Sequence, residues 1–288
     1  PATLLPIEYK LPISSAQVKS AILLAGLQAP GNTSVIESEP TRDHTELMLR
    51  EFGAKITIED HKDGSRKITL IGQPELRAQD INVPGDISSA AFPLVAALII
   101  PNSKLTITNI GINPLRSGLI ESLRDMGSSI ELINIRDNNG NKTADLVATA
   151  RPMRGIDVPA KRAPSMIDEY PILAIAAAYA CGTTTMTGLS ELRVKESDRI
   201  DSMTKGLINC GIKVNQTKDT LTIHGNGNNP KGGAVIAANL DHRIAMAFLV
   251  CGMGSNDPIT IDDASPIKTS FPRFRQLMNI LGGKIELL

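Results

Sequence analysis

Four stretches of the chain are almost wholly apolar and long enough to form helices. They lie at residues 20–27, 90–100, 172–180 and 244–253. A helix that is apolar on every side is normally buried, so this pattern predicts four buried helices. After a short turn, each leads into a segment rich in β-branched residues, which predicts a strand. These strands are expected at residues 33–36, 105–108, 183–186 and 259–262.

A second helix, amphipathic this time, is predicted after each of these pairs, and it ends at a glycine that leads into another strand. The glycines are Gly53, Gly127, Gly211 and Gly282, at intervals of about 70–85 residues. Glycine suits the left-handed backbone conformation just beyond a helix C-terminus. Because both patterns keep the same order in four copies, we expect an α/β protein built from internal repeats.

The boundary between domains is marked by a change of composition. Residues 73–80 are polar and carry no core pattern, whereas a new unit starts within residues 81–86. We therefore expect residues 1–80 to hold one unit and residues 81–288 to hold three.

The charge balance excludes some classes of partner. Lys+Arg and Asp+Glu residues number 30 each, so no net field would hold nucleic acid or an anionic membrane. No apolar run is long enough to span a bilayer, and the first residues lack the regions of a signal peptide. We expect a cytoplasmic protein without nucleic-acid or membrane partners, in which any anion site is a local cluster of cations. Pro1 is interpreted as a cut or processed end.

The three cysteines, Cys181, Cys210 and Cys251, are far apart and show no CxxC spacing. We interpret them as small buried residues in a reducing compartment. A nucleophilic or metal-binding role is the alternative.

Polar clusters stand where two of the predicted helices begin. Ser14, with Gln17 three residues later, fits a capping box, but free N–H groups and hydroxyls at a helix start can also bind phosphate. Asp43 and Glu46 suit the first turn of the next helix because their charge complements the helix dipole. Arg42 opposes that dipole, which favours an anionic partner.

Three more clusters lie further along the chain. Asp168 and Glu169 precede an apolar helix, where they either favour the helix start or supply a base. Residues 192–199 place three cations and two acids ahead of a helix, as a solvated charged run or as a site at a strand-to-helix turn. The Asp-His-Arg sequence at 241–243 opens the last apolar helix, at a corner that is polar in every repeat.

Taken together, these residues resemble the EPSP synthase family. The resemblance covers essentially the whole chain in the family's order. The Lys-Glu-Ser-Asp-Arg and Asp-His-Arg-Ile-Ala-Met sequences are highly specific, and Ser-Ala-Gln resembles a bacterial subgroup that includes glyphosate-tolerant enzymes. The matching segments are residues 11–21, 41–46, 193–199, 241–246 and 270–272.

The resemblance implies an inside-out α/β fold of two domains, each with three βαβαββ-type units and with the substrates in the cleft between the domains. It also implies transfer of the enolpyruvyl group of phosphoenolpyruvate to the 5-hydroxyl of shikimate 3-phosphate, with release of phosphate. This chemistry serves aromatic amino-acid biosynthesis and requires no metal or organic cofactor. The complete enzyme is expected to be a monomer.

The resemblance also implies roles for single residues. Asp168 is the leading base for the hydroxyl, with Lys195 beside it, and Glu196 is the proton donor or acceptor at the methylene carbon. The clamp for phosphoenolpyruvate consists of Lys195, Arg199 and Arg243, with His242 in the same catalytic group. The expected contacts to shikimate 3-phosphate are Ser15, Ala16, Gln17, Arg42, Asp168 and Lys195.

Two motifs of the family are absent, Pro-Gly-Asp-Lys-Ser and Asn-Ser-Gly-Thr. We therefore expect an incomplete N-terminal domain and little activity without a missing N-terminal segment. Two alternatives stay open. One is enolpyruvyl transfer to UDP-N-acetylglucosamine on the same fold, against which residues 195–199 argue, and the other is an inactive fragment or a non-catalytic binding module.

Overall fold

The computed structural model describes residues 4–138 and 140–287. The chain divides into two compact units. The first unit comprises residues 1–84, 112–116 and 136–143, and the second comprises residues 85–111, 117–135 and 144–288.

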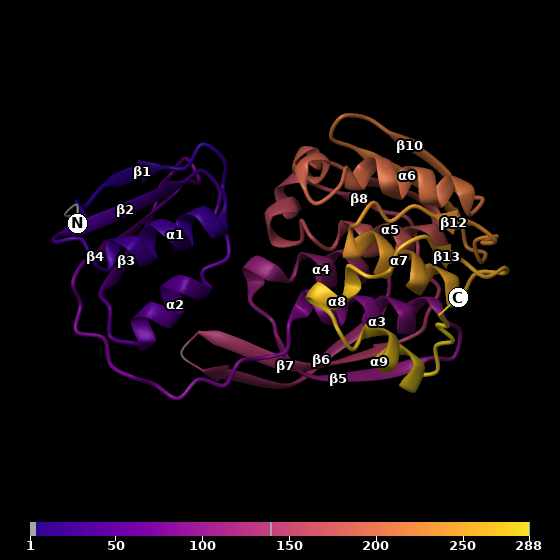
Figure 1. Ribbon diagram of the computed structural model, residues 1–288, viewed down its shortest axis with the longest axis horizontal. Helices are drawn as coiled ribbons and strands as arrows, with labels where there is room; N and C mark the ends of the chain where they lie inside the picture. The colour runs from indigo at the N-terminus through magenta and orange to yellow at the C-terminus, as the bar shows by residue number, and fades with distance from the viewer. Residues whose placement is uncertain (1–3, 139, 288) are drawn as a thin grey trace. The chain divides into compact units, whose positions relative to one another are not determined.

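The first unit is a four-stranded sheet with two helices on one face (Figure 1). Leu23 of its first helix packs with Val35, Ile68 and Leu70 of the strands, and all four side chains are fully buried. The strand order is β1-β2-β4-β3, with β1 parallel to β2 and the other neighbours antiparallel. The elements are β1 (Glu8–Lys10), α1 (Ala16–Gly26), β2 (Asn32–Glu37), α2 (His44–Glu51), β3 (Ile56–Asp60) and β4 (Arg66–Ile71).

Three apolar helices form the middle of the second unit. They are α3 (Ile87–Ile99), α5 (Tyr170–Tyr179) and α7 (His242–Gly252), and each packs against the other two. Every residue of α5 is buried. The core of this unit therefore lies between helices, as the absence of a polar face on them predicts.

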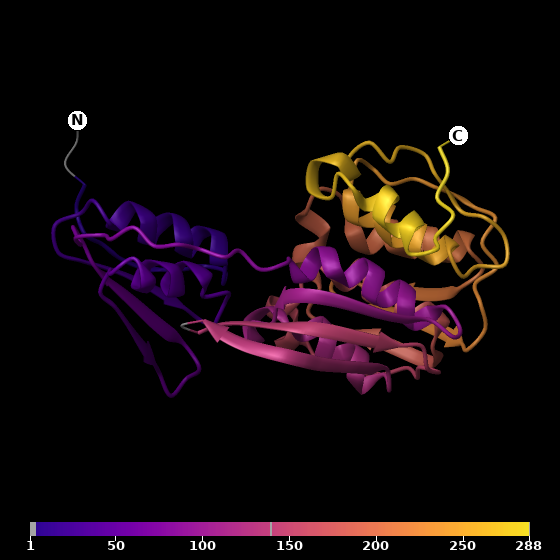
Figure 2. The ribbon, with the colours of Figure 1, turned by 90° about the horizontal axis from the view of Figure 1, so that it is seen from below.

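The sheets of the second unit lie outside this group of helices, as Figure 2 shows for the sheet of β5, β7 and β6. That sheet contains β5 (Lys104–Gly111), β7 (Asn141–Thr149) and β6 (Ser129–Asn138), in this order. A second sheet has the order β10 (Lys213–Gln216), β11 (Leu221–Asn226), β9 (Cys181–Met186) and β8 (Asp157–Val158), and β12 (Val235–Ile236) pairs with β13 (Thr260–Ile261).

The second helix of each repeat is also present. These helices are α2, α4 (Gly118–Asp125), α6 (Arg199–Asn209) and α9 (Phe274–Ile280). The four predicted glycines follow them with φ of 96°, 90°, 85° and 102°, so their left-handed conformation is confirmed. The shorter elements are η1 (Pro114–Arg116), η2 (Ala160–Ser165), η3 (Ser190–Val194) and α8 (Ile267–Ser270).

The repeat extends to a side-chain contact that composition does not reveal. The guanidinium of Arg50 in α2 donates to the carbonyl of Ile56, six residues later. Arg124 in α4 makes the same contact with Ile130. In both repeats the helix end is therefore tied to the strand that follows.

The last repeat lacks the predicted strand, because residues 283–287 adopt no strand. The side chain of Asn279 donates to the carbonyl of Ile285 at 2.9 Å and accepts from its N–H at 2.8 Å. These bonds occupy the backbone groups that a neighbouring strand would otherwise bind.

Helix α1 is not buried on every side, which corrects the prediction for this helix. Leu23 is buried, but Val18, Ala21, Leu24 and Ala25 are exposed. Helix α1 lies on β2 and β4, whereas α3, α5 and α7 each pack between two helices of their own kind. Burial on all sides thus depends on partner helices that the described part of the first unit does not supply.

Cys210 and Cys251 are buried as predicted, but Cys181 is exposed, because it starts β9 at a position whose side chain meets solvent. All three are free thiols. Among residues 4–138 and 140–287, no helix has the length and hydropathy that crossing a membrane requires.

Candidate active site

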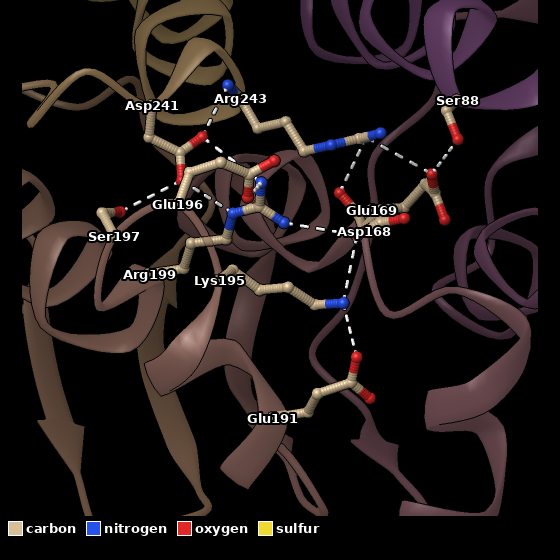
Figure 3. A network of polar contacts seen from close by, with 10 residues as sticks. All are labelled: Ser88, Asp168, Glu169, Glu191, Lys195, Glu196, Ser197, Arg199, Asp241 and Arg243. Carbon is tan, nitrogen blue, oxygen red and sulfur yellow. Dashed lines mark hydrogen bonds and ion pairs between the residues drawn. The ribbon is translucent and has the colours of Figure 1, made fainter. Parts of the chain in front are cut away.

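The starts of four helices meet in the second unit, where polar side chains form one connected network (Figure 3). Ser88 of α3 bonds to Glu169, which precedes α5. Arg199, the first residue of α6, reaches Asp168 before α5 and Asp241 before α7. Helix N-termini favour negative charge, so carboxylates and bound anions are both stabilised at such a place.

Arg199 is the centre of this network. Its side chain is 1% exposed and contacts three carboxylates. Nε lies 2.8 Å from Asp241 Oδ2, Nη1 lies 3.3 Å from Asp168 Oδ1, and Nη2 lies 2.5 Å from Glu196 Oε2. The buried guanidinium is thus fixed by acids from three different segments.

Asp241 holds Arg199 and also caps α7. Its carboxylate accepts from the backbone N–H of Arg243 at 2.9 Å and from the hydroxyl of Ser197 at 3.0 Å. Burial acts to raise the pKa of Asp241, but the hydrogen bond and charge of Arg199, together with the hydrogen bonds from Arg243 and Ser197, outweigh it, so this pKa lies below its ordinary value. Asp241 is therefore a permanent anion at neutral pH.

Asp168, Lys195 and Glu196 form the reachable edge of the network. The side chains of Asp168 and Lys195 are 22% and 21% exposed, and Glu196 is 49% exposed. Lys195 Nζ lies 3.9 Å from Asp168 Oδ1 and donates a short hydrogen bond to Glu191. Asp168 thus lies between the cations of Lys195 and Arg199.

Arg243, the second residue of α7, is held from the side of α5. Its Nη1 donates to the backbone carbonyl of Asp168 at 3.0 Å and lies 3.5 Å from Glu169 Oε1. Glu169 is 2% exposed and accepts a short hydrogen bond from Ser88. Glu169, held in place by Ser88, thus fixes the Arg243 guanidinium from a buried position.

His242 lies at the same place, beside Arg243. Burial and the charge of Arg243 lower its pKa below the ordinary 6.5, against the opposing charges of Asp241 and Glu196. His242 is therefore a neutral imidazole at pH 7, able to donate and accept hydrogen bonds but adding no positive charge.

The remaining predicted residues, Ser15, Ala16, Gln17 and Arg42, lie in the first unit. Ser15, not Ser14 as predicted, is the N-cap of α1, and its hydroxyl accepts from the N–H of Val18 at 3.4 Å. Ser14 instead bonds to Ser38 and to the backbone N–H of Glu39, so it joins the segment after β2. This segment carries Arg42 to the start of α2.

The acids of the first unit do more than complement a helix dipole. Asp43, the N-cap of α2, accepts from the side chain of Asn113 at 2.6 Å. Glu46 is buried against Lys19, and its pKa is raised by burial in spite of the lysine's charge. These pairings join residues far apart in sequence, which local patterns do not reveal.

The sequence led to five residues of the network in the second unit, which are Asp168, Lys195, Glu196, Arg199 and Arg243, and to His242 beside Arg243. It missed the roles of Glu169, Glu191, Ser197 and Asp241 as partners. Ser88 and Asp241 stand at the polar helix start that recurs in each repeat. This repetition is the sequence feature that could have identified them as members of the network.

Residues 190–194 form the 3₁₀ helix η3, between β9 and α6. Arg193, within η3, donates to the backbone carbonyls of Thr217 and Lys218, in the turn between β10 and β11, and pairs with Asp198 at 2.8 Å. The guanidinium stabilises this turn and lies apart from the network.

Residues 2–278 match the family described as EPSP synthase (3-phosphoshikimate 1-carboxyvinyltransferase). The chain is 57% identical over 281 residues to the 3-phosphoshikimate 1-carboxyvinyltransferase of Paramagnetospirillum magneticum, covering 98% of this chain and 63% of that protein. It is 57% identical over 287 residues to that of Rhodospirillum rubrum, covering 100% of this chain and 64% of that protein. The chain thus spans less than two thirds of the length of these relatives.

Two solved structures of enolpyruvyl transferases are also similar to this chain. EPSP synthase from Acinetobacter baumannii superposes with a TM-score of 0.90 at 46% identity, over 99% of this chain and 64% of that one. The enolpyruvyl transferase NikO from Streptomyces tendae superposes with a TM-score of 0.71 at 20% identity, over 92% and 58%, which supports the fold alone. The predicted enolpyruvyl transferase-like α/β fold is confirmed, and the chain belongs to the EPSP synthase family.

Proposed function

We propose that this polypeptide is part of an enzyme that transfers the enolpyruvyl group of phosphoenolpyruvate to the 5-hydroxyl of shikimate 3-phosphate. One observation carries the proposal. Lys195, Arg199 and Arg243 lie in one network with Asp168 and Glu196, at the starts of α5, α6 and α7. It combines cations for an anionic substrate with carboxylates for proton transfer.

The cations bind phosphoenolpyruvate in this proposal. Arg243 and Lys195 are 16% and 21% exposed, so their tips can reach a carboxylate or phosphate. Arg199 is buried and already bonded to three acids, so it opens to a ligand only on the side where Glu196 now sits. Glu196 is half-exposed and is therefore the member that moves aside.

Asp168 is the proposed base. Its partly exposed carboxylate lies beside Lys195 and can accept the proton of the attacking hydroxyl. The hydroxyl oxygen bonds to the central carbon of phosphoenolpyruvate while the terminal carbon gains a proton. Loss of that methyl proton and cleavage of the C–O bond then release phosphate.

Glu196 is the proposed proton donor and acceptor at the terminal carbon. When phosphoenolpyruvate takes its place on Arg199, the released Glu196 carboxylate takes up a proton from solvent, gives it to the terminal carbon during addition, and accepts a methyl proton during elimination. His242, neutral and next to Arg243, completes the group as a hydrogen-bonding residue. Binding of substrate thus frees the group that acts on it.

Shikimate 3-phosphate is proposed to bind to Ser15, Ala16, Gln17 and Arg42 of the first unit. The hydroxyl and backbone N–H groups at the start of α1 and the guanidinium of Arg42 suit a phosphate. Asp168 and Lys195 are proposed to meet its reacting hydroxyl.

We propose that residues 1–80 are the last unit of an N-terminal domain and residues 81–288 a C-terminal domain. Val18, Ala21 and Leu24 form an exposed apolar side of α1. This side would be covered if two further helices packed on α1 as α3, α5 and α7 pack on one another. The portion of the relatives that this chain does not cover is the proposed source of these helices. The complete protein is proposed to be monomeric. It is also proposed to be cytoplasmic, because three free thiols fit a reducing compartment.

The test is complementation. The portion of the Rhodospirillum rubrum relative that this chain does not cover is mixed with the chain or fused to it, and phosphate release from phosphoenolpyruvate is measured. We expect turnover with shikimate 3-phosphate and none with UDP-N-acetylglucosamine. A folded mixture that releases no phosphate with shikimate 3-phosphate would contradict the proposal.

A further inference from the structure

A buried lysine ties the start of α1 to the segment that carries Arg42. Lys19 is 1% exposed, and its Nζ lies 2.8 Å from Glu46 Oε1 and 3.2 Å from Glu37 Oε2. The same Nζ donates to the backbone carbonyl of Thr41 at 3.3 Å. One ammonium group therefore joins the end of β2, the following segment and the first turn of α2 to α1.

The fold does not require a charge at this position. Lys19 is the fourth residue of α1, and the fourth residues of α3, α5 and α7 are Ala90, Leu173 and Ala245. All three are buried and apolar. Burying a lysine with two carboxylates seldom adds stability over an apolar residue, because each charge loses its hydration. Another reason for Lys19 is therefore needed.

The place of the ammonium group supplies that reason. The backbone N–H of Lys19 bonds to the carbonyl of Ser15, so the lysine belongs to the turn that presents Ser15, Ala16 and Gln17. Its Nζ holds the carbonyl of Thr41, directly before Arg42. The backbone of Lys19 is thus bonded to Ser15, one of the residues proposed to bind shikimate 3-phosphate, and its ammonium group is bonded to Thr41, the neighbour of Arg42.

Lys19 itself is out of reach of a ligand. It is fully enclosed, and Glu37, Glu46 and Thr41 supply partners for its three N–H groups. Glu37 is in turn fixed by the hydroxyl of Thr41, at 2.7 Å. Any influence on binding is therefore exerted through the position of its neighbours.

We propose that Lys19 is a positioning residue that sets the spacing between the start of α1 and Arg42 for a phosphate-bearing substrate. The inference rests on the proposed function, since it assigns shikimate 3-phosphate to these groups. It predicts that loss of the ammonium group weakens binding of this substrate and leaves the chemistry at the other substrate nearly intact.

The test uses Lys19→Met in the complemented protein, paired with the control Lys67→Met. Lys67 forms an exposed ion pair with Glu8 in the same unit. We expect Lys19→Met to raise KM for shikimate 3-phosphate about tenfold or more, because small displacements of binding groups are costly. The kcat and the KM for phosphoenolpyruvate should change less than about threefold, and Lys67→Met should change none of the three by more than that.

A second variant provides a test in case Lys19→Met, which leaves two buried carboxylates without their cation, does not fold. Lys19→Met/Glu46→Gln leaves one buried carboxylate, which Thr41 still bonds, and should show the same selective rise in KM. Unchanged KM for shikimate 3-phosphate in a folded variant would overturn the inference. So would an equal loss in kcat and both KM values, which indicates general damage.

Binding separates this inference from the proposed function. Shifts of the Ser15 and Gln17 amide NMR signals on addition of shikimate 3-phosphate are compared in wild-type and Lys19→Met proteins. Binding by wild type without turnover contradicts the proposed function alone. Equal binding by the variant contradicts the positioning role, and no binding by wild type contradicts both.

Discussion

Glu196 Oε2 lies 2.5 Å from Nη2 of Arg199, three residues later at the start of α6. The guanidinium is 1% exposed, whereas the Glu196 side chain is 49% exposed. A half-exposed carboxylate thus occupies the outer side of a buried cation whose other partners, Asp168 and Asp241, are more firmly enclosed. In the proposed mechanism an anionic substrate takes the place of Glu196 and leaves the pairs of Arg199 with Asp168 and Asp241 intact.

Replacing Glu196 by Gln should separate binding from chemistry. We expect kcat of the complemented protein to fall by about 10²–10⁴-fold, since the proposed proton donor and acceptor is lost. The KM for phosphoenolpyruvate should stay the same or fall, because a neutral amide competes less for Arg199. Steady-state kinetics with each substrate in turn would measure both effects.

The matched control is Asp201→Asn, which removes a carboxylate from the first turn of α6, five residues after Glu196, at an exposed pair with Lys205. It should leave kcat and both KM values nearly unchanged. If Glu196→Gln retained wild-type kcat, or raised the KM for phosphoenolpyruvate strongly, the role of Glu196 would be wrong.

Asp241→Asn should destabilise the second unit. The amide can still cap α7, but Arg199 loses its fully buried counter-charge. Removing one member of a buried ion pair costs about 3–5 kcal/mol of unfolding free energy. Urea unfolding would measure this, and Asp60→Asn, at the exposed pair with Arg66, should cost less than about 1 kcal/mol.

The same residue predicts a dependence on pH. The folded pKa of Asp241 lies below the ordinary 3.8, so the folded state binds this proton less readily than the unfolded state. Its contribution to stability is present above pH 3.8 and is lost as the pH falls through the folded pKa. Asp241→Asn should remove this part of the acid dependence, and an unchanged dependence would show that other carboxylates cause it.

The repeat pattern of the sequence predicted much of this fold, because each part of it is local. Each of the four helix ends has a residue with a left-handed backbone, and glycine adopts this conformation most readily, so a single residue type reveals the helix end. These residues are Gly53, Gly127, Gly211 and Gly282. The burial of α1 was predicted wrongly from the same kind of pattern. Composition says that a helix is apolar, but only partner helices decide whether each side is covered.

The candidate site was predictable only where its residues stand in short specific runs. Residues 195–199 and 241–243 pointed to Lys195, Arg199 and Arg243. Their buried partners did not stand out, since Glu169 and Asp241 each resemble an ordinary acid at a helix start. Nothing local indicates that Lys19, on an apolar helix, meets Glu37 at the end of the next strand and Glu46 in the first turn of the helix after it. Long-range pairing of charges is a property of the folded chain.

His242 should titrate at lower pH than an exposed histidine. Burial and the charge of Arg243 lower its folded pKa below 6.5, so the unfolded state binds the proton more readily. Stability is therefore lost as the pH falls from 6.5 to the folded pKa. NMR titration of the imidazole signals would show this, with His242→Gln identifying the signal, and a midpoint at or above 6.5 would contradict the prediction.

Gly206→Ala should destabilise the second unit, although alanine favours a helix interior. Gly206 lies in the middle of α6, against the ring of Phe248 on α7, and an added Cβ would overlap three ring atoms. Overpacking of this kind costs about 1–3 kcal/mol, more than the roughly 1 kcal/mol that alanine gains over glycine in helix propensity. The lower urea midpoint should be accompanied by a higher KM for phosphoenolpyruvate, because α6 begins with Arg199 and Arg243 is the second residue of α7. Adding Phe248→Leu should restore part of the stability lost in Gly206→Ala, whereas Phe248→Leu alone should destabilise by leaving space in the core. Additive effects of the two substitutions would show that the contact between α6 and α7 does not limit the size of the residue at this position.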